Sequence, residues 1–304
     1  MNGNNGVFDS SRMYWIHALT PLHVGSGRGI SFIDLPIMRE KITGWPIIPG
    51  SSVKGVWLDY ANARNVDESL VGAAFGKASD SNANDHSGSF AITDARIVLL
   101  PVRSLYGTFA YVTAPLVLKR LVRDMEAMGM KELPKVPEVE EQGAILVTRN
   151  SVLVSGGRVF FEDLDFSVGQ PDGPNAAVVD EWAGFLSRTL FEKADYHELL
   201  KRRLALVPDS AFDFLCQQGT EVNARIRIDN EKKTTARGAL WYEECLPAES
   251  VLAGIVWCER VFGSNLTPDE LLDKFCKDPI NCQMGGKATV GKGYVRCLFA
   301  GRGD

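Results

Sequence analysis

The chain has 304 residues, a formal net charge of −5 and a pI near 5.5. This acidic balance argues against indiscriminate binding of nucleic acid, for which a basic domain is expected. No stretch has the roughly 20 consecutive apolar residues of a membrane span, and the start, MNGNNGVFDSSR, lacks the regions of a signal peptide. The six cysteines form no CxxC pair. We therefore expect a cytoplasmic protein with reduced thiols and no membrane contact.

Hydrophobic patterns predict the elements of the first half of the chain. The apolar run Met13–Leu19 predicts a buried strand, and residues 51–65 predict an amphipathic helix with Val53 and Trp57 on its apolar face. Beyond them we expect a polar, glycine-rich connection at 72–88, strands at 89–100 and 109–114, a helix at 115–128 and a surface linker at 131–142.

The second half mixes further strands and helices. Two apolar runs flank Gly156-Gly157, which predicts a hairpin over Gly143–Phe166, and Asn223–Trp241 alternates like a longer hairpin with a basic tip. We also expect a linker at 167–175, a helix at about 177–203, a strand at 251–260, a helix at 267–277 and a strand at 293–299. Because strands and helices do not alternate regularly, the predicted fold class is α+β.

A glycine-rich loop near the amino terminus lies between two titratable groups. Gly25, Gly27 and Gly29 give up side-chain packing, which is typical where backbone bends sharply or approaches a ligand. His23 precedes the loop, and Asp34 follows it between apolar neighbours, where an exposed carboxylate is not expected.

Pro49-Gly50-Ser51-Ser52 is a helix-start signal, and Lys54 falls in the first turn of the helix. The exposed N–H groups of a helix start attract anions, and the lysine adds a full charge. Together with the preceding glycine loop and carboxylate, this helix start indicates a site that handles phosphates.

Two segments carry an excess of positive charge despite the acidic total. Residues 222–240 hold five basic and two acidic residues, and residues 285–302 hold four basic residues and no acid. These segments would suit contact with a structured RNA, or they are simply two solvated basic loops. The basic residues are Arg225, Arg227, Lys232, Lys233 and Arg237 in the first segment, and Lys287, Lys292, Arg296 and Arg302 in the second.

The run GKATVGKG at 286–293 nearly matches the nucleotide-binding P-loop. Gly293 replaces the serine or threonine that holds magnesium, and the next residues, YVRCLF, predict a strand where a P-loop requires a helix. We therefore reject ATP binding and expect glycine N–H groups and lysines to contact RNA phosphates. The spacings of Gly25-Ser26-Gly27 and of the late cysteines fit neither a nucleophile elbow nor a zinc site.

Three motifs occur in the order in which one protein family carries them. They are LTPLHVGSG with IDLPIMRE and GWPIIPGSSVKG at 19–55, GALWYEECLP at 238–247, and GGKATVGKGYVRC at 285–297. In these stretches the chain resembles the RAMP superfamily, and more narrowly the repeated backbone subunits of type III-B (Cmr) CRISPR effector complexes.

The resemblance implies a modified ferredoxin-like, RRM-like core with a β-hairpin thumb and helical insertions. We expect one domain over residues 1–304, with insertions at about 67–88, 129–175 and 222–241. The hairpin Asn223–Trp241 is the first choice for the thumb, and Gly143–Phe166 is the second.

The resemblance also implies that the chain binds guide RNA (crRNA) and cleaves complementary target RNA. The implied partners are other Cmr complex subunits and multiple copies of the chain in a helical stack. Asp34 matches the family aspartate on which cleavage depends. It would hold Mg²⁺ or another divalent cation transiently with the RNA, or help to activate the 2′-hydroxyl, which leaves a 2′,3′-cyclic phosphate.

Further site residues follow from the same motifs. His23, Tyr242 and Glu243 are additional catalytic candidates, although strand alternation puts Tyr242 and Glu243 on opposite faces. The implied RNA-binding residues are Arg39, Ser51, Ser52, Lys54, Arg225, Arg227, Gly285, Gly286, Lys287, Gly291, Lys292 and Gly293.

Each assignment has a structural alternative. Asp34 would cap a turn, His23 would anchor the glycine loop through a backbone hydrogen bond, and Lys54 would be a solvated helix-start lysine. Trp241 and Tyr242 would pack in the core instead of stacking on a base. Two alternative functions follow, a non-catalytic guide-RNA-binding subunit and a free, metal-independent guide-processing RAMP endoribonuclease that uses His23.

Overall fold

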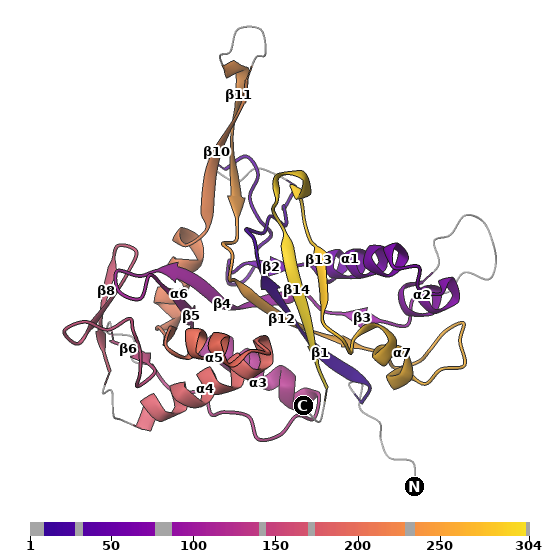
Figure 1. Ribbon diagram of the computed structural model, residues 1–304, viewed down its shortest axis with the longest axis horizontal. Coiled ribbons are helices and arrows are strands. Elements are labelled where there is room, and N and C mark those ends of the chain that lie inside the picture. Colours follow the sequence, from indigo (N-terminus) through magenta and orange to yellow (C-terminus); the bar gives the residue numbers. More distant parts are fainter. Residues whose placement is uncertain are drawn as a thin grey trace.

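A large sheet with helices packed around it forms the body of the protein, and one hairpin projects far from that body (Figure 1). The computed structural model describes residues 9–27, 33–76, 87–139, 144–169, 174–228 and 235–301. In this part of the chain, no helix is both long and apolar enough to cross a membrane.

The described residues form the following elements. The strands are β1 (Ser11–Ala18), β2 (Ile47–Ile48), β3 (Ala91–Ile92), β4 (Ala95–Arg103), β5 (Phe109–Thr113), β6 (Ala144–Val147), β7 (Arg158–Phe161), β8 (Leu164–Val168), β9 (Leu204–Leu206), β10 (Glu221–Ile228), β11 (Thr235–Cys245), β12 (Val251–Trp257), β13 (Ile280–Gln283) and β14 (Tyr294–Ala300). The helices are α1 (Gly50–Ala63), α2 (Glu68–Phe75), α3 (Pro115–Ala127), α4 (Pro174–Leu190), α5 (Ala194–Lys201), α6 (Asp209–Gln218) and α7 (Pro268–Phe275), with a 3₁₀ turn at Ala288–Val290.

The main sheet runs in the order β13-β14-β1-β12-β4-β5-β9-β6-β8-β7, with β2 beside β4 and β3 beside β12. Its pairs are antiparallel except β5–β9 and β6–β8, which are parallel. Strands β10 and β11 form a separate two-stranded hairpin. This mixture of a mostly antiparallel sheet with helices confirms the predicted α+β class.

Strand β1 lies inside the sheet between β12 and β14, and it is buried on both faces. Its continuous apolar sequence fits that position, since a strand covered on both sides needs no polar face. The Tyr14 ring packs edge-on against Trp57 of α1, with ring centroids 5.2 Å apart, and its hydroxyl donates to the Thr93 carbonyl oxygen at 2.6 Å. Opposite it on β12 is Gly254, where a Cβ atom would meet the Tyr14 hydroxyl at 2.5 Å. The missing side chain makes room for the tyrosine ring.

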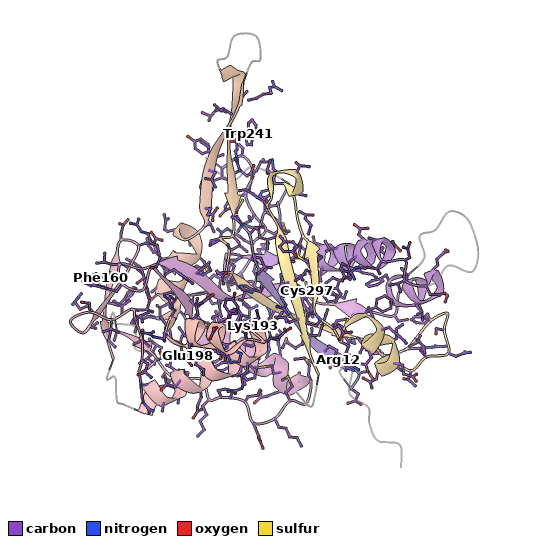
Figure 2. All side chains as sticks on the ribbon, in the orientation of Figure 1. Arg12, Phe160, Lys193, Glu198, Trp241 and Cys297 are labelled. Carbon is purple, nitrogen blue, oxygen red and sulfur yellow. The ribbon has the colours of Figure 1, made fainter. Side chains whose placement is uncertain are left out.

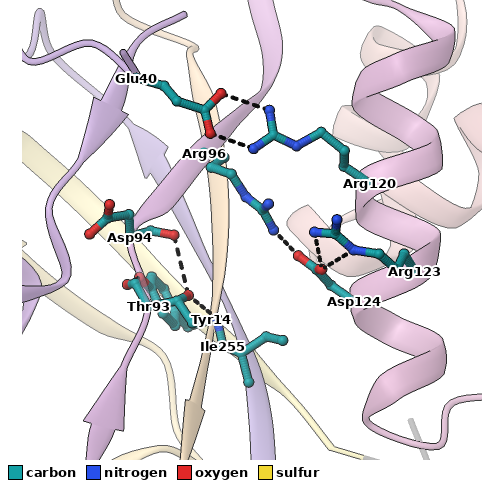
Figure 3. Close-up of polar contacts among 9 residues, drawn as sticks. All are labelled: Tyr14, Glu40, Thr93, Asp94, Arg96, Arg120, Arg123, Asp124 and Ile255. Carbon is teal, nitrogen blue, oxygen red and sulfur yellow. Dashed lines mark hydrogen bonds and ion pairs between the residues drawn. The ribbon is translucent and has the colours of Figure 1, made fainter. Parts of the chain in front are cut away.

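An ion-pair network joins helix α3 to the sheet (Figure 3). The Arg120 guanidinium donates two hydrogen bonds to Glu40, at 2.5 and 2.8 Å, and these bonds help to lower the pKa of Glu40 to about 2. Arg96 of β4 and Arg123 of α3 both pair with Asp124. The network fixes the turn that follows Arg39.

Several predicted elements differ from the structure in their limits. The strand expected at 89–100 is interrupted at Thr93-Asp94, because Asp94 turns away to accept a hydrogen bond from the Gly50 amide at 2.8 Å. The helix expected at 177–203 is two helices, α4 and α5. The polar connection expected at 72–88 begins inside α2, whose first turn is capped by Asp67. Its residues 77–86 lie outside the described part of the chain.

The hairpin expected over Gly143–Phe166 is wrong in its pairing. Strand β6 runs parallel to β8, and the antiparallel partner of β8 is β7. The chain reverses at Glu162-Asp163, where Glu162 has a positive φ of 48°, and Gly156-Gly157 only forms a tight turn before β7. The apolar run at 144–147 is therefore a sheet strand, and the hairpin is confined to β7 and β8.

Candidate functional site

The two arms of the amino-terminal glycine loop pair with each other and then with β11. Gly25 bridges Ile37, and the Ser26 amide donates to the Pro36 carbonyl at 3.0 Å. Residues 33–37 extend the hairpin sheet, because the Leu35 amide donates to the Tyr242 carbonyl at 3.0 Å. The segment that carries Asp34 is therefore fixed to the foot of the β10–β11 hairpin. Gly29 lies outside the described residues.

Asp34 is exposed, and its position is set by main-chain contacts. Its Oδ2 accepts a hydrogen bond from the Tyr242 amide at 2.8 Å. Among the described residues, none donates a hydrogen bond to its Oδ1. The Tyr242 amide thus positions the carboxylate, and no described residue blocks a ligand from its Oδ1 by a hydrogen bond.

Glu244 is a site residue to which sequence reasoning gave no role. Its side chain is buried, and it accepts hydrogen bonds from the Ile37 amide at 3.0 Å and from Arg39 at 2.5 Å. Arg39 also donates to the carbonyl oxygens of Gly44 and Cys216, at 2.9 and 3.0 Å. The guanidinium that was expected to bind RNA therefore helps to hold the Asp34 segment against β11. Strand alternation, which places Glu244 on the same face as Tyr242, was the available signal.

Glu243 points into a cluster of cations. It is buried, and its carboxylate lies 3.2 Å from the Lys287 ammonium, 3.4 Å from the Lys292 ammonium and 3.9 Å from Nε of Arg225. Burial by itself would raise the pKa of Glu243, but the two lysines hold it below its ordinary value. The cluster keeps an excess of positive charge at the foot of the hairpin.

The two lysines of the carboxy-terminal glycine loop differ in exposure. The Lys287 side chain is about one-third exposed, whereas Lys292 is buried and its ammonium donates to the Cys245 sulfur at 2.8 Å. Lys287 can reach a phosphate. The expected direct phosphate contact of Lys292 finds no support in its burial, and this side chain instead holds the loop to β11.

His23 is buried between the two glycine loops. Its Nδ1 lies 2.6 Å from the Glu244 carbonyl oxygen, so this nitrogen carries the proton and donates it. The backbone carbonyl of His23 accepts a hydrogen bond from the Gly286 amide at 2.8 Å. These contacts favour the anchoring alternative for His23, while Nε2 of a neutral ring remains available as an acceptor next to Gly25.

The carboxy-terminal loop needs glycine mainly for packing. A Cβ atom at Gly285 would lie 2.3 Å from the His23 carbonyl oxygen, and one at Gly293 would lie 2.1 Å from the Met284 carbonyl oxygen. Gly291, by contrast, has open space around it. The loop leads into strand β14, as expected, and this arrangement excludes a P-loop.

Lys54 lies in the first turn of α1, and no described carboxylate pairs with it. The anion-attracting start of that helix is partly occupied by Asp94, which accepts from the Gly50 amide. Sequence reasoning missed this contact. Ser51 is exposed and Ser52 half-buried, so both remain candidates for contact with RNA.

The hairpin itself carries the remaining candidates. Along β10, Arg225 is half-buried and Arg227 is exposed, and Tyr242 of β11 is 37% exposed on the face opposite Glu243. Trp241 lies on the projecting hairpin (Figure 2). Lys232, Lys233, the Arg237 side chain and Arg302 lie outside the described residues.

Of the described side chains, Asp34 is the exposed carboxylate at this site, since Glu243 and Glu244 are buried and paired with cations. In the described part of the chain, no group of three histidine, cysteine, aspartate or glutamate side chains lies close enough together to hold a metal. The open Oδ1 of Asp34 suits a single inner ligand of a hard cation, whose other ligands would be water and phosphate oxygens. The described residues therefore form no closed metal site, and Asp34 could supply one ligand to a cation whose other ligands come from elsewhere.

Comparison with known proteins establishes the family. The model of the RAMP superfamily matches residues 15–296. The chain belongs to the RAMP superfamily. The resemblance based on three sequence motifs is thereby confirmed.

Several individual relatives carry names from Cmr CRISPR systems. The chain is 35% identical over 287 residues to "CRISPR system Cmr endoribonuclease Cmr4" of Pyrococcus furiosus, covering 92% of each chain. It is 26% identical to "CRISPR system CMR subunit Cmr4" of Saccharolobus solfataricus, covering 93% of this chain and 94% of that protein. A crystal structure of oligomeric Cmr4 from Pyrococcus furiosus matches with a TM-score of 0.74 and 27% identity, covering 96% of this chain and 98% of the other.

Proposed function

We propose that this chain is a backbone subunit of a type III-B (Cmr) effector complex, which binds guide RNA and cleaves complementary target RNA at Asp34. The observation that carries this proposal is the fixed, exposed Asp34 carboxylate at the foot of a projecting hairpin, next to the cationic cluster around Glu243. The Pyrococcus furiosus relative, 35% identical over most of the chain, is named an endoribonuclease.

The chemistry proposed is attack by an RNA 2′-oxygen on the adjacent phosphorus. The Asp34 carboxylate takes the proton from the 2′-hydroxyl or orients it, the bond to the 5′-oxygen breaks, and the products end in a 2′,3′-cyclic phosphate and a 5′-hydroxyl. Lys287, about one-third exposed beside Glu243, stabilises the negative charge that develops on the phosphate. A divalent cation held between Asp34 and the RNA would supply further charge neutralisation.

The hairpin β10–β11 is proposed as the thumb, because it projects from the body and carries Arg225 and Arg227 along its length (Figure 1). We also propose a ferredoxin-like core. In chain order β1, α1, β4, β12, α7 and β14 form a βαββαβ series, and their strands lie side by side as β14-β1-β12-β4. This 4-1-3-2 order is that of a ferredoxin-like sheet.

Several copies are proposed to stack along one guide RNA beside other Cmr subunits. A 27% identical relative with the same fold crystallised as an oligomer, which supports self-association. The alternative of a free guide-processing nuclease is less favoured, because His23 is buried and its Nδ1 is bound to a backbone carbonyl.

The test is target cleavage by the reconstituted complex with Asp34→Asn. The amide keeps an oxygen for the Tyr242 N–H, so assembly and target binding should match the unaltered complex. The cleavage rate should fall about 10²–10⁴-fold, as expected when one acid–base group is lost. Asp163→Asn, an exposed turn residue on β7–β8, is the matched control and should cut normally. Normal cleavage by assembled Asp34→Asn complex would refute the assignment and favour a non-catalytic subunit.

A further inference from the structure

A second site lies apart from the hairpin. A cavity of about 500 Å³ opens between the sheet and the turn that joins α4 to α5. Its walls come from β1, β5, β13, β14 and the two helices, and Lys193 lies on the helical side. Figure 2 shows Lys193 in the body of the molecule, well away from the projecting hairpin that carries Trp241.

The walls of the cavity present flat aromatic rings. Tyr196 is 50% exposed and stacks on Phe191, with ring centroids 5.7 Å apart and an interplanar angle of 27°. Phe191 in turn meets His17 edge-on, and Tyr294 is a further partly exposed ring in the lining. A tyrosine ring that is backed by a second ring on one side and open on the other suits the face of a planar ligand.

An ionised carboxylate also lines the cavity. Oε2 of Glu249 accepts hydrogen bonds from His17 at 2.9 Å and from the Tyr111 hydroxyl at 2.5 Å. Burial would raise the pKa of Glu249, but these two donors hold it below its ordinary value, so the group accepts hydrogen bonds at neutral pH. No described residue donates to Oε1. Oε1 is therefore available to an N–H donor of a ligand in the cavity.

Two cations complete the lining. Lys193 is exposed and pairs with no described carboxylate, while Arg296 pairs with Glu192. Nε of Arg296 is buried and has no hydrogen-bond partner among the described residues. Lys193 is thus the cation without a described counter-ion, and the guanidinium of Arg296 is a second positive group beside it. A phosphate has enough oxygens to contact the two at once.

We propose that this cavity binds one nucleotide with an amino-bearing base. The base stacks on Tyr196, its exocyclic amine donates to Oε1 of Glu249, and the phosphate lies against Lys193 and Arg296. The lining suits a ligand with a planar ring, an N–H hydrogen-bond donor and an anionic group, and a nucleotide has all three. The ligand is either a free mononucleotide or one unstacked nucleotide of an RNA strand. The site is independent of Asp34.

Calorimetric titration of the full chain tests this assignment. The ligands are AMP, GMP and CMP, a single-stranded RNA hexamer, inorganic phosphate, and purine riboside 5′-monophosphate, which lacks only the 6-amino group of AMP. At least one amino-bearing nucleotide or the hexamer should bind. Tyr196→Ala should weaken binding between about five-fold and about 100-fold, the usual effect of losing a base–aromatic stack. Lys193→Glu should weaken it as well.

The controls separate this cavity from the proposed RNA site. Tyr106→Ala removes a similarly exposed ring that lies against Phe160 elsewhere, and it should leave binding unchanged. If AMP binds, purine riboside 5′-monophosphate should bind at least ten-fold more weakly. Selective binding of the hexamer identifies an RNA strand as the source, and selective binding of a mononucleotide identifies a free nucleotide.

Three results would overturn the assignment. They are no binding of any nucleotide or of the hexamer at millimolar concentration, binding of inorganic phosphate as tight as that of the nucleotides, and binding that Lys54→Glu abolishes while Tyr196→Ala leaves it intact. None of these results bears on cleavage at Asp34, which is measured separately.

Discussion

Replacing Glu243 with glutamine should destabilise the protein, because it leaves two lysines without their counter-ion. The Glu243 carboxylate lies 3.2 and 3.4 Å from the Lys287 and Lys292 ammonium groups. At an effective dielectric constant of about 20, each pair attracts by about 5 kcal/mol before the cost of burial is subtracted. Removing one partner of a buried pair typically costs about 3–5 kcal/mol. Because glutamine can still accept a hydrogen bond, we expect a loss of about 3 kcal/mol.

A double-mutant cycle with Lys292→Met measures the interaction by urea denaturation. Lys292 is the partner to choose, since it is buried while Lys287 is partly exposed. The double variant should recover part of the loss, with a coupling free energy of about 1–3 kcal/mol. The pKa of Glu243 is lowered on folding, so its contribution is present above the ordinary carboxylate pKa and is lost as the pH falls. A Glu243→Gln variant within 0.5 kcal/mol of the unaltered protein, or a cycle with no coupling, would refute this reasoning.

Two further perturbations test the loop and the ion-pair network. Gly293→Ala should lower the free energy of unfolding by about 2–5 kcal/mol, because the backbone is left-handed there and a Cβ atom would lie 2.1 Å from the Met284 carbonyl oxygen. Gly291→Ala is equally left-handed but uncrowded, and it should lower that free energy by only about 1–2 kcal/mol. Equal losses by urea denaturation would contradict the packing argument. Glu40→Gln should destabilise the protein by about 1 kcal/mol at neutral pH, after discounting for solvent screening, and the difference should vanish as the pH falls from about 4.5 to about 2, through the lowered pKa of Glu40. A difference that persists at pH 2 would show that Arg120 does not hold this carboxylate as a charged partner.

Patterns that depend on near neighbours in the chain were readable from the sequence. The continuous apolar run at β1, the proline at the start of α3 and the alternation along β10 and β11 each predicted the element that is found. Short or interrupted elements were not predicted. Strand β13 is a four-residue edge strand, and the break between β3 and β4 exists because Asp94 caps a helix 44 residues away. Helix α6 was also missed, although Pro208 and Asp209 form a recognisable helix start.

The candidate site was predicted in its residue types more than in its contacts. The sequence predicted Asp34, His23 and Glu243 as site residues. It could not show that two lysines, 44 and 49 residues further along the chain, enclose Glu243. Arg39 and Lys292 have the charge expected of phosphate ligands, yet each forms an ion pair with a buried glutamate of β11. Whether a cation faces solvent or a buried carboxylate depends on tertiary packing, which local pattern does not encode.

Hydrogen bonds to the main chain of β11 hold Asp34 and its neighbour Leu35. Its fixed oxygen is bound to the Tyr242 amide, and the neighbouring Leu35 is bound to the backbone on both sides of Glu243. The carboxylate is therefore joined directly to the last residues of β11, at the foot of the hairpin. Any shift of β11 when RNA contacts the hairpin must move Asp34 with it, because the main-chain bonds join them without an intervening flexible side chain. If Asp34 cuts RNA as proposed, it would therefore move together with the hairpin that contacts that RNA.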